Sequence, residues 1–215
     1  MDSQENIVFY SCLINNRDDA KPMLFQDGFK RILFTDNPSL SAPDWQIREP
    51  VKVFTDPVRT SRYHKLHPFE IFPDAEYAIW LDMTHTPYQS LRPLISNNDL
   101  TLHLHCQRTS VSQEVRACQT YKKDSPFILN SQISYYLKEG FPDNIGLYST
   151  SCLIMKNTYK FKLLSELWWN EICHWSKRDQ ISLPYCLWRL NMKPNIISGL
   201  ERNGFSPYFK FKSHN

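Results

Sequence analysis

The stretch YAIWLDMTHTP, residues 77–87, decides the fold that we expect for this chain. Its apolar run, residues 77–81, stops at Asp82, and the chain continues through Thr84 and His85 to a proline. A short apolar run bounded in this way is consistent with a buried strand. In open α/β sheets, ligands bind beyond the carboxyl ends of the strands. We therefore expect Asp82 to project from the end of a core strand into a ligand-binding crevice.

Strand and helix patterns alternate on both sides of this stretch. Short, β-rich apolar runs predict strands within residues 6–14, 30–38, 44–54, 99–106 and 147–157. Helical spacing, capping residues and stop signals predict helices within residues 18–28, 56–68, 92–98, 110–121, 126–140, 158–176 and 178–191. This alternation predicts an α/β fold in which helices flank a sheet of mostly parallel strands.

The overall composition narrows the class of protein. The 215 residues suit one domain with a single substantial core. The formal net charge is +3, and Lys and Arg are spread along the chain, which favours an anionic small ligand over nucleic acid. The six cysteines form no CxxC pair, so we expect buried, reduced thiols. We expect a cytoplasmic protein without a transmembrane segment, because no apolar stretch approaches roughly 20 residues and the N-terminus is acidic.

Two groups of residues near the opening stretch suggest a metal and phosphate site. Asp82 and Thr84 offer oxygen ligands for a hard divalent cation, although Asp82 could equally accept backbone N–H groups in a turn. Arg62 and Lys65 lie three residues apart, and hence on one face of the predicted helix at 56–68. Two cations there would hold a diphosphate, whereas the purely structural alternative is a solvated, charged helix face.

Three further segments carry candidate polar residues. In SKRDQ, Asp179 is either an ordinary helix cap or a base or sugar-hydroxyl acceptor, desolvated among aromatic residues such as Trp169. In HCQRTSVSQE, Arg108 and Glu114 form either a buried pair that shapes a pocket or an external salt bridge. The tail SPYFKFKSHN would supply His214 as a metal ligand, unless its end is frayed.

Four segments, taken together and in this order, resemble a known family. They are RYHKLHPFEIFPDAEYAIWLDMTHTP, HCQRTSVSQE, GFPDNIGLYSTSCLIMKN and LWWNEICHWSKRDQISLPYCL. They are similar to a glycosyltransferase-like family that was long carried as a domain of unknown function. Its members occur in plant mucilage and turgor proteins, in bacteria and at the amino terminus of a chlorella-virus glycosyltransferase. The resemblance covers nearly the whole chain.

The resemblance implies a GT-A glycosyltransferase fold, with a single Rossmann-like mixed sheet flanked by helices. It implies a nucleotide-sugar-binding half at about residues 1–105 and an acceptor half at about residues 106–215. The implied reaction moves a sugar from a nucleotide-diphosphate donor, such as UDP-glucose or UDP-rhamnose, to a hydroxyl of a glycan or glycoprotein, with Mn²⁺ or Mg²⁺ as cofactor. Whether the chain is one module of a longer polypeptide, and whether it is a viral protein that works in host cytoplasm, stays open.

The same resemblance implies metal and catalytic roles. Asp82 matches the first acid of the family's DxD signature, but Thr84 stands where a second acid is usual, so a hydroxyl, a water or His214 is expected to complete the metal shell. Asp179 is the expected base if the reaction inverts configuration. If the reaction retains configuration, Asp179 is expected to hold donor hydroxyls while the leaving phosphate takes the proton.

The resemblance also implies the ligands of the donor. The expected nucleoside contacts are Tyr10 and Ser11, and the expected diphosphate ligands are Arg62 and Lys65. Gln180 is expected beside Asp179 in the sugar pocket. Further pocket residues, to which the resemblance assigns no role, are His105, Arg108, Glu114 and Trp169.

Two other classes of function stay open on the sequence. The threonine in the DxD-like signature fits a catalytically silent module that binds a nucleotide or sugar without turnover. The mild basicity and aromatic content fit a nucleic-acid binder, whose affinity should fall steeply with salt. Of the three, the metal-dependent transferase accounts for the most residues.

Overall fold

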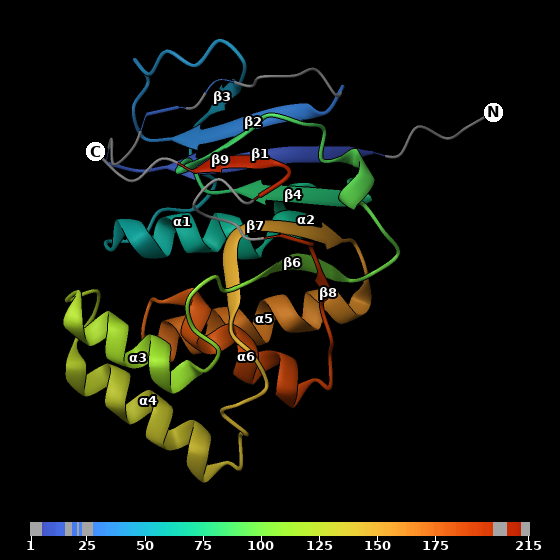
Figure 1. Cartoon of the computed structure of the whole chain (residues 1–215). Coiled ribbons are helices and arrows are strands. Elements are labelled where there is room, and N and C mark those ends of the chain that lie inside the picture. Colours follow the sequence, from blue (N-terminus) through green and yellow to red (C-terminus); the bar gives the residue numbers. More distant parts are fainter. Residues whose placement is uncertain (1–5, 16–18, 21, 23–27, 200–205, 212–215) are drawn as a thin grey trace.

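A seven-stranded sheet forms the centre of the computed structural model, which describes residues 6–15, 19–20, 22, 28–199 and 206–211. The strands lie in the spatial order β3-β2-β1-β4-β7-β6-β8 (Figure 1). Their bounds are β1 Ile7–Leu13, β2 Lys30–Thr35, β3 Gln46–Arg48, β4 Tyr77–Leu81, β6 Leu100–Leu104, β7 Tyr148–Lys156 and β8 Asn195–Ile196. The mixed α/β sheet flanked by helices confirms the expected fold class.

The direction of the strands changes at β7. Strands β3, β2, β1 and β4 are mutually parallel, whereas β7 pairs antiparallel with both β4 and β6. Because β7 comes from the second half of the chain and lies between two strands of the first half, one sheet spans the expected boundary at residue 105. The division into a donor half and an acceptor half stays a prediction.

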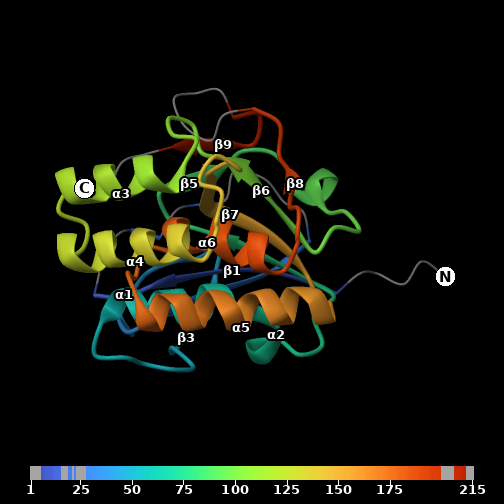
Figure 2. The same ribbon diagram turned by 90° about the horizontal axis from the view of Figure 1, so that it is seen from below.

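Both faces of the sheet are covered, as Figure 2 shows from below. Helices α1 Pro57–Leu66, α2 Pro68–Ile71, α5 Tyr159–His174 and α6 Asp179–Arg189 pack on one face. The other face carries a short ribbon of β5 His85–Pro87 and β9 Phe209–Phe211, beside the 3-10 turn Arg92–Leu94. Alternate residues of β1 therefore enter different cores: Val8 and Tyr10 face the helices, and Ile7 and Phe9 face the ribbon side. Burial on both faces explains the unbroken apolar runs in the sequence.

The remaining helices form a smaller layer at one end of the sheet. Helices α3 Val111–Thr120 and α4 Pro126–Lys138 share a third apolar cluster with one side of α6. Ser110 caps α3 by accepting a hydrogen bond from the backbone of Gln113, and Gly140, with φ of 84°, follows the end of α4. These ends agree with the sequence signals. The helix expected at 18–28 falls largely outside the described residues.

Three smaller features concern the cysteines, helix α5 and the length of the helices. All six cysteines are free, and four of them are buried, whereas Cys173 is exposed. Leu164, Trp168 and Ile172 form a buried stripe along α5, and Trp175, directly after the helix, is partly buried. None of the helices in the described residues is both long and apolar enough to cross a membrane.

Candidate functional site

A cavity of about 760 Å³ opens at the carboxyl ends of β1 and β4. Its walls come from the start of α1, one face of α3, the loop after β6, the polar part of β7 and the start of α6. A volume of this size suits a ligand of the class of a nucleotide or nucleotide sugar. The sheet places the cavity where its parallel half meets the antiparallel β7, which is the position expected from the opening stretch.

Asp82 follows β4 directly and lies in the cavity wall. Its backbone N–H donates to the carbonyl of Ser151 at 2.7 Å, which ties it to β7. Its Oδ1 accepts from the Trp80 indole at 2.7 Å and lies 3.6 Å from the Lys65 ammonium. No described residue hydrogen-bonds to Oδ2, and the side chain is 33% exposed, so this oxygen is open to a ligand.

Asp179, the first residue of α6, is the centre of a buried ion cluster. Its Oδ2 accepts from the Lys65 ammonium at 2.7 Å and from the Thr150 hydroxyl at 2.8 Å. Its Oδ1 lies 3.2 Å from the Arg62 guanidinium. Both oxygens are thus engaged, and the side chains of Asp179 and Lys65 are at most 1% exposed.

The charges around Asp179 determine its protonation. Burial alone raises the pKa of Asp179, but Arg62, Lys65 and Arg178 outweigh burial and hold that pKa well below its usual value. The carboxyl group is therefore ionised at neutral pH, and its negative charge is shared among the surrounding cations. A carboxylate in this state is a poor proton acceptor.

A second ion cluster borders the cavity at α3. The Arg108 Nε donates to Glu114 Oε2 at 2.6 Å, and His105 Nε2 lies 3.9 Å from the same oxygen. The Cys118 thiol donates to the other Glu114 oxygen at 3.4 Å. Burial and the Glu114 charge raise the pKa of Cys118 to about 11, which keeps the thiol protonated as a donor. Arg108 and Glu114 thus form the pocket-shaping pair that was one of the two sequence interpretations.

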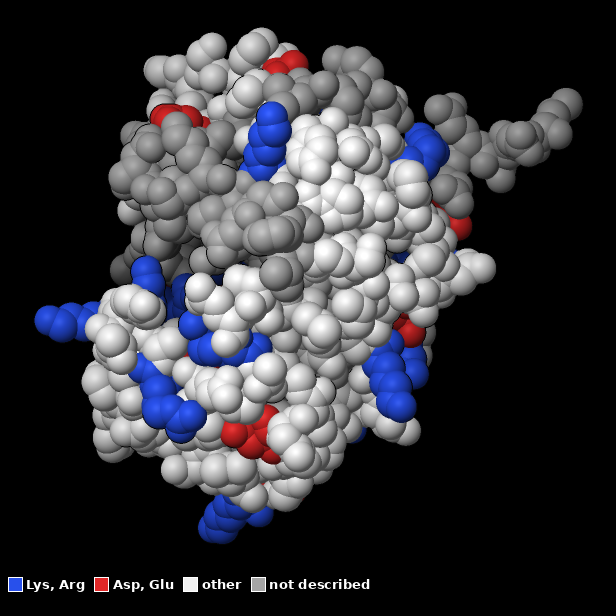
Figure 3. All heavy atoms as spheres, in the orientation of Figure 1, with Lys and Arg blue, Asp and Glu red and all other residues white. Residues whose placement is uncertain are grey.

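The cavity is rich in cationic side chains. Arg62, Arg108, Lys123, Lys177 and Arg178 line it. On the face drawn in Figure 3, Lys and Arg gather over the α3 end of the molecule, with few acids among them. Arg62 Nε is buried and has no hydrogen-bond partner among the described residues. An anionic ligand would supply the missing acceptor.

Comparison with known proteins gives the family. Residues 45–206 match the family model of the TOD1/MUCI70 glycosyltransferase-like domain. The chain belongs to this family. The TOD1/MUCI70 match includes all the elements that line the cavity except β1 and the turn that follows it. It confirms the family resemblance that the sequence motifs suggested.

A plant relative carries the name of a sugar-transferring enzyme. The chain is 28% identical over 170 residues to the Arabidopsis thaliana protein named "Probable hexosyltransferase MUCI70". The alignment covers 71% of this chain but only 29% of that protein. The family and this relative identify the chain as a glycosyltransferase-like domain that spans less than a third of the plant protein's length.

The structure gathers most of the predicted site residues around one cavity. Those that line it are Ser11, Arg62, Asp82, Thr84, His105, Arg108, Glu114, Asp179 and Gln180. Gln180 donates to the carbonyl of Tyr148 at 3.3 Å, and the Ser11 hydroxyl donates to the carbonyl of Leu81 at 2.7 Å. His214 lies outside the described residues, so its expected metal role stays a prediction.

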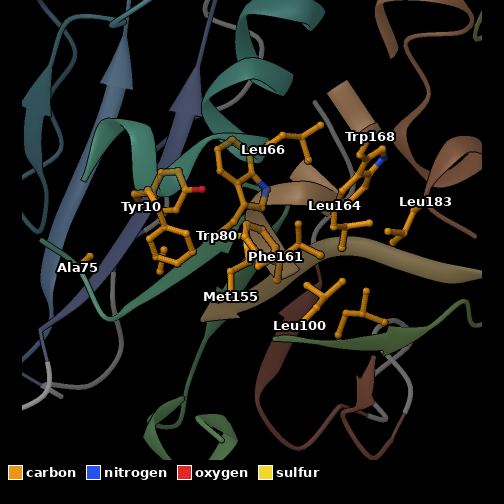
Figure 4. Packing of buried hydrophobic residues seen from close by; sticks show 14 of the residues in the cluster. Tyr10, Leu66, Ala75, Trp80, Leu100, Met155, Phe161, Leu164, Trp168 and Leu183 are labelled. Atoms are coloured by element: carbon orange, nitrogen blue, oxygen red, sulfur yellow. The ribbon is translucent and has the colours of Figure 1, made fainter. Parts of the chain in front are cut away.

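Two predicted donor ligands and one predicted pocket residue do not line the cavity. Tyr10 is fully buried, with its ring against Trp80 (Figure 4) and its hydroxyl donating to the Lys65 carbonyl, so it cannot reach a nucleoside. Lys65 is 0% exposed and does not line the cavity, so it neutralises acids of the site and does not touch a diphosphate. Trp169 packs on Phe54 and Tyr63, away from the lining residues. Tyr10 and Lys65 miss the cavity because β1 and α1 turn their side chains toward the interior.

The sequence interpretation missed two residues of the Asp179 cluster. Arg178 directly precedes Asp179 and was part of the quoted SKRDQ segment, but received no role. Thr150 lies in the polar triplet of residues 149–151 within the otherwise apolar β7. A run of hydroxyl residues in a strand buried on both faces was the available signal, since such groups require a polar partner.

Proposed function

We propose that the chain transfers a sugar from a nucleotide-diphosphate donor, of the UDP-sugar class, to a hydroxyl of a glycan. The observation that carries this proposal is the open Asp82 carboxylate beside Arg62 in one cavity. Membership of the glycosyltransferase-like family supports the reaction class. The choice of a UDP-sugar and of a hexose or deoxyhexose rests on the sequence resemblance and on the name of the plant relative.

The cationic residues of the cavity would stabilise the leaving diphosphate. Arg62 lines the cavity and is fixed by Asp179, so its guanidinium is held in place before the donor arrives. Arg178 adds a second guanidinium at the same end. Preorganised cations stabilise charge that develops in a transition state without reorganising during the reaction. Lys65, which lies behind the cavity wall, would neutralise the negative charges of Asp82 and Asp179.

A divalent cation at Asp82 fits the donor atoms that the protein offers. Asp82 Oδ2 is available, and the Thr84 hydroxyl lies in the same wall. Among the described residues, no set of three His, Cys, Asp or Glu ligands gathers at Asp82. A site with one carboxylate suits an ion that keeps several waters and binds substrate phosphates, as Mg²⁺ does. Bound there, such an ion would supply further positive charge for the departing diphosphate.

Asp179 would act as a positioning residue in this reaction. Its depressed pKa and its two engaged oxygens do not suit the base that an inverting reaction requires. The other acids in the described cavity lining, Asp82 and Glu114, each lie close to a cation. We therefore favour retention of configuration, in which the leaving phosphate takes the acceptor proton.

Donor turnover tests the proposal. We expect the chain to release UDP from at least one UDP-sugar in the presence of Mn²⁺ or Mg²⁺, and EDTA to suppress the release. Asp82→Asn should lower the rate by about 100-fold or more, since it removes the carboxylate that would hold the divalent cation at the leaving diphosphate. Asp74→Asn, a matched change of an exposed aspartate outside the cavity, should leave the rate unchanged.

The outcome distinguishes the proposal from its alternative. UDP binding that is insensitive to EDTA and gives no release across the panel would favour the catalytically silent module. Folded protein that binds no UDP and turns over no donor would overturn the proposal. If Asp82→Asn released UDP at the wild-type rate, Asp82 would have no role in the reaction.

A further inference from the structure

A second polar cluster lies outside the cavity, at the corner between α1 and α2. His67, Glu70 and Glu166 each bring one potential ligand atom to within 4.8 Å of the others. His67 joins α1 to α2, Glu70 belongs to α2, and Glu166 belongs to α5. None of these three residues lines the cavity. The cluster therefore needs an explanation that is separate from the donor site.

His67 is prepared as a neutral nitrogen ligand. Its side chain is 5% exposed, and its Nδ1 lies 3.0 Å from the carbonyl of Tyr63. A ring nitrogen facing a carbonyl must donate, so Nδ1 carries the proton and Nε2 keeps its lone pair. Among the described residues, nothing hydrogen-bonds to Nε2. Metal-bound histidines show this arrangement, in which the second nitrogen donates to a carbonyl or carboxylate.

The electrostatics of His67 agree with this role. Burial lowers the pKa of His67, although the charges of Glu70 and Glu166 oppose the shift. The imidazole is therefore neutral at neutral pH, which is the form that binds a metal. The stacked Tyr63 ring, 4.3 Å from the imidazole centroid to centroid, fixes the orientation of the imidazole.

The two glutamates lack a paired cation. Glu166 is exposed and has no hydrogen bond or ion pair with any described residue. Glu70 accepts a short hydrogen bond from the Tyr63 hydroxyl. Lys52 is a neighbouring cation, but its ammonium lies over the Tyr63 ring, 4.7 Å from the centroid, and pairs with neither glutamate in the described structure. Two like charges this close repel each other, and a bound cation would remove that repulsion.

We propose that His67, Glu70 and Glu166 bind a Zn²⁺ ion. One imidazole nitrogen with two carboxylate oxygens is a ligand mixture that zinc accepts, with water in the fourth position. The imidazole disfavours Ca²⁺ and Mg²⁺, which prefer oxygen ligands. The ion would join α2 to α5 beside an existing link, in which the Ser165 hydroxyl donates to the Leu66 carbonyl.

The proposed ion would stabilise the helix corner that positions the cavity. Helix α1 ends at Leu66, directly before His67, and carries both Arg62 and Lys65. Fixing this end to α5 would hold those cations against Asp179. The proposal requires no nucleotide and does not depend on the proposed transferase activity.

Zinc titration of metal-free protein tests the proposal. We expect the wild-type chain to bind a single equivalent of Zn²⁺ by calorimetry and to unfold at a higher temperature when the ion is present. Glu166→Gln removes one ligand from an exposed residue, and should weaken binding by at least about tenfold and abolish the thermal shift. Glu76→Gln, a matched change of an exposed glutamate outside the cluster, should behave as wild type.

Two further variants distinguish zinc binding at His67, Glu70 and Glu166 from zinc binding in the cavity. Glu70→Gln should weaken Zn²⁺ binding as Glu166→Gln does, whereas Asp82→Asn should not. Zinc binding that Asp82→Asn abolishes and Glu166→Gln preserves would place the ion in the cavity and overturn the proposal. Wild-type affinity in both glutamate variants, or no binding by the wild-type chain, would overturn it as well.

Discussion

The two ion clusters that border the cavity are built over very different sequence distances. Asp179 meets Lys65 across 114 residues, and its Oδ2 also accepts from Thr150 across 29 residues. Glu114 meets Arg108 across six residues and Cys118 across four. Both clusters hold a cation against a buried carboxylate. Only the first requires α1, β7 and α6 to be packed before any of its bonds can form.

The clusters also differ in their contact with water. The side chains of Lys65 and Asp179 are 0% and 1% exposed, whereas Arg108 is 23% exposed. A fully buried charge depends on its partner, because removal of the partner leaves the charge without solvation. Arg108 can turn to water if Glu114 is changed. We therefore expect buried ion pairs between distant residues to contribute more to the free energy of unfolding than partly exposed pairs between neighbouring residues. The partly exposed pairs are expected mainly to shape the pocket.

The largest expected effect is that of Asp179→Asn. This change leaves Lys65 and Arg62 facing a neutral amide, so we expect the free energy of unfolding to fall by about 3–5 kcal/mol. Urea unfolding followed by circular dichroism measures this loss. Asp74→Asn, at an exposed position, should change the free energy by less than about 0.5 kcal/mol. Equal free energies of unfolding for the two variants would contradict the conclusion that the buried Asp179 cluster stabilises the fold.

Lowering the pH should remove most of the contribution that Asp179 makes to the free energy of unfolding. Asp179 has a native pKa below the ordinary aspartate value of about 3.8, so its contribution to stability is fully present above that value. The contribution is lost as the pH falls from about 3.8 toward the lower native pKa, because the unfolded chain then takes up the proton first. The stability difference between wild type and Asp179→Asn should thus be constant above about pH 5 and shrink in acid. A difference that grows in acid would contradict the assigned pKa shift.

A smaller effect is expected for Glu114→Gln. Arg108 keeps access to water and Cys118 keeps an acceptor, so we expect a loss of about 1–2 kcal/mol in unfolding free energy. The same urea experiment measures it. A loss as large as that of Asp179→Asn would contradict this expectation. It would show that burial of the carboxylate alone sets the loss in unfolding free energy, whatever the sequence distance between the partners.

Thr150→Val should cost about 1 kcal/mol. The change keeps the shape of the side chain and removes one hydrogen bond to Asp179, while both cation contacts remain. Thermal unfolding should therefore show a modest decrease in the melting temperature. A cost near that of Asp179→Asn would mean that the hydroxyl, and not the charges, holds the cluster together.

The smallest effect should be that of Arg189→Gln. Arg189 and Glu139 form an ion pair with side chains 46% and 38% exposed, and water solvates both charges once the pair is broken. We expect a change of less than about 0.5 kcal/mol by urea unfolding. A larger change would mean that exposed ion pairs also stabilise this protein, which would weaken the contrast between buried and exposed ion pairs.

Much of the fold could be predicted from local patterns. The buried strand that ends before Asp82 and the helix that carries Arg62 are confirmed, because each depends on its own apolar run or cap. The β4–β7 pairing could not be predicted, since periodicity within a strand does not name its neighbour. That pairing brings Ser151 to the backbone of Asp82 and thus determines one wall of the cavity.

The sequence by itself determined the strand that presents Asp82, the helix that carries Arg62, the family resemblance carried by four motifs in order, and the local pair of Arg108 and Glu114. Only the tertiary structure decided that Lys65 and Tyr10 lie beneath the cavity and that Asp179 lies buried among Arg62, Lys65 and Arg178, which lower its pKa. The physical reason is that desolvation and charge pairing depend on what surrounds a group in space, and residues more than a hundred positions away supply those surroundings here.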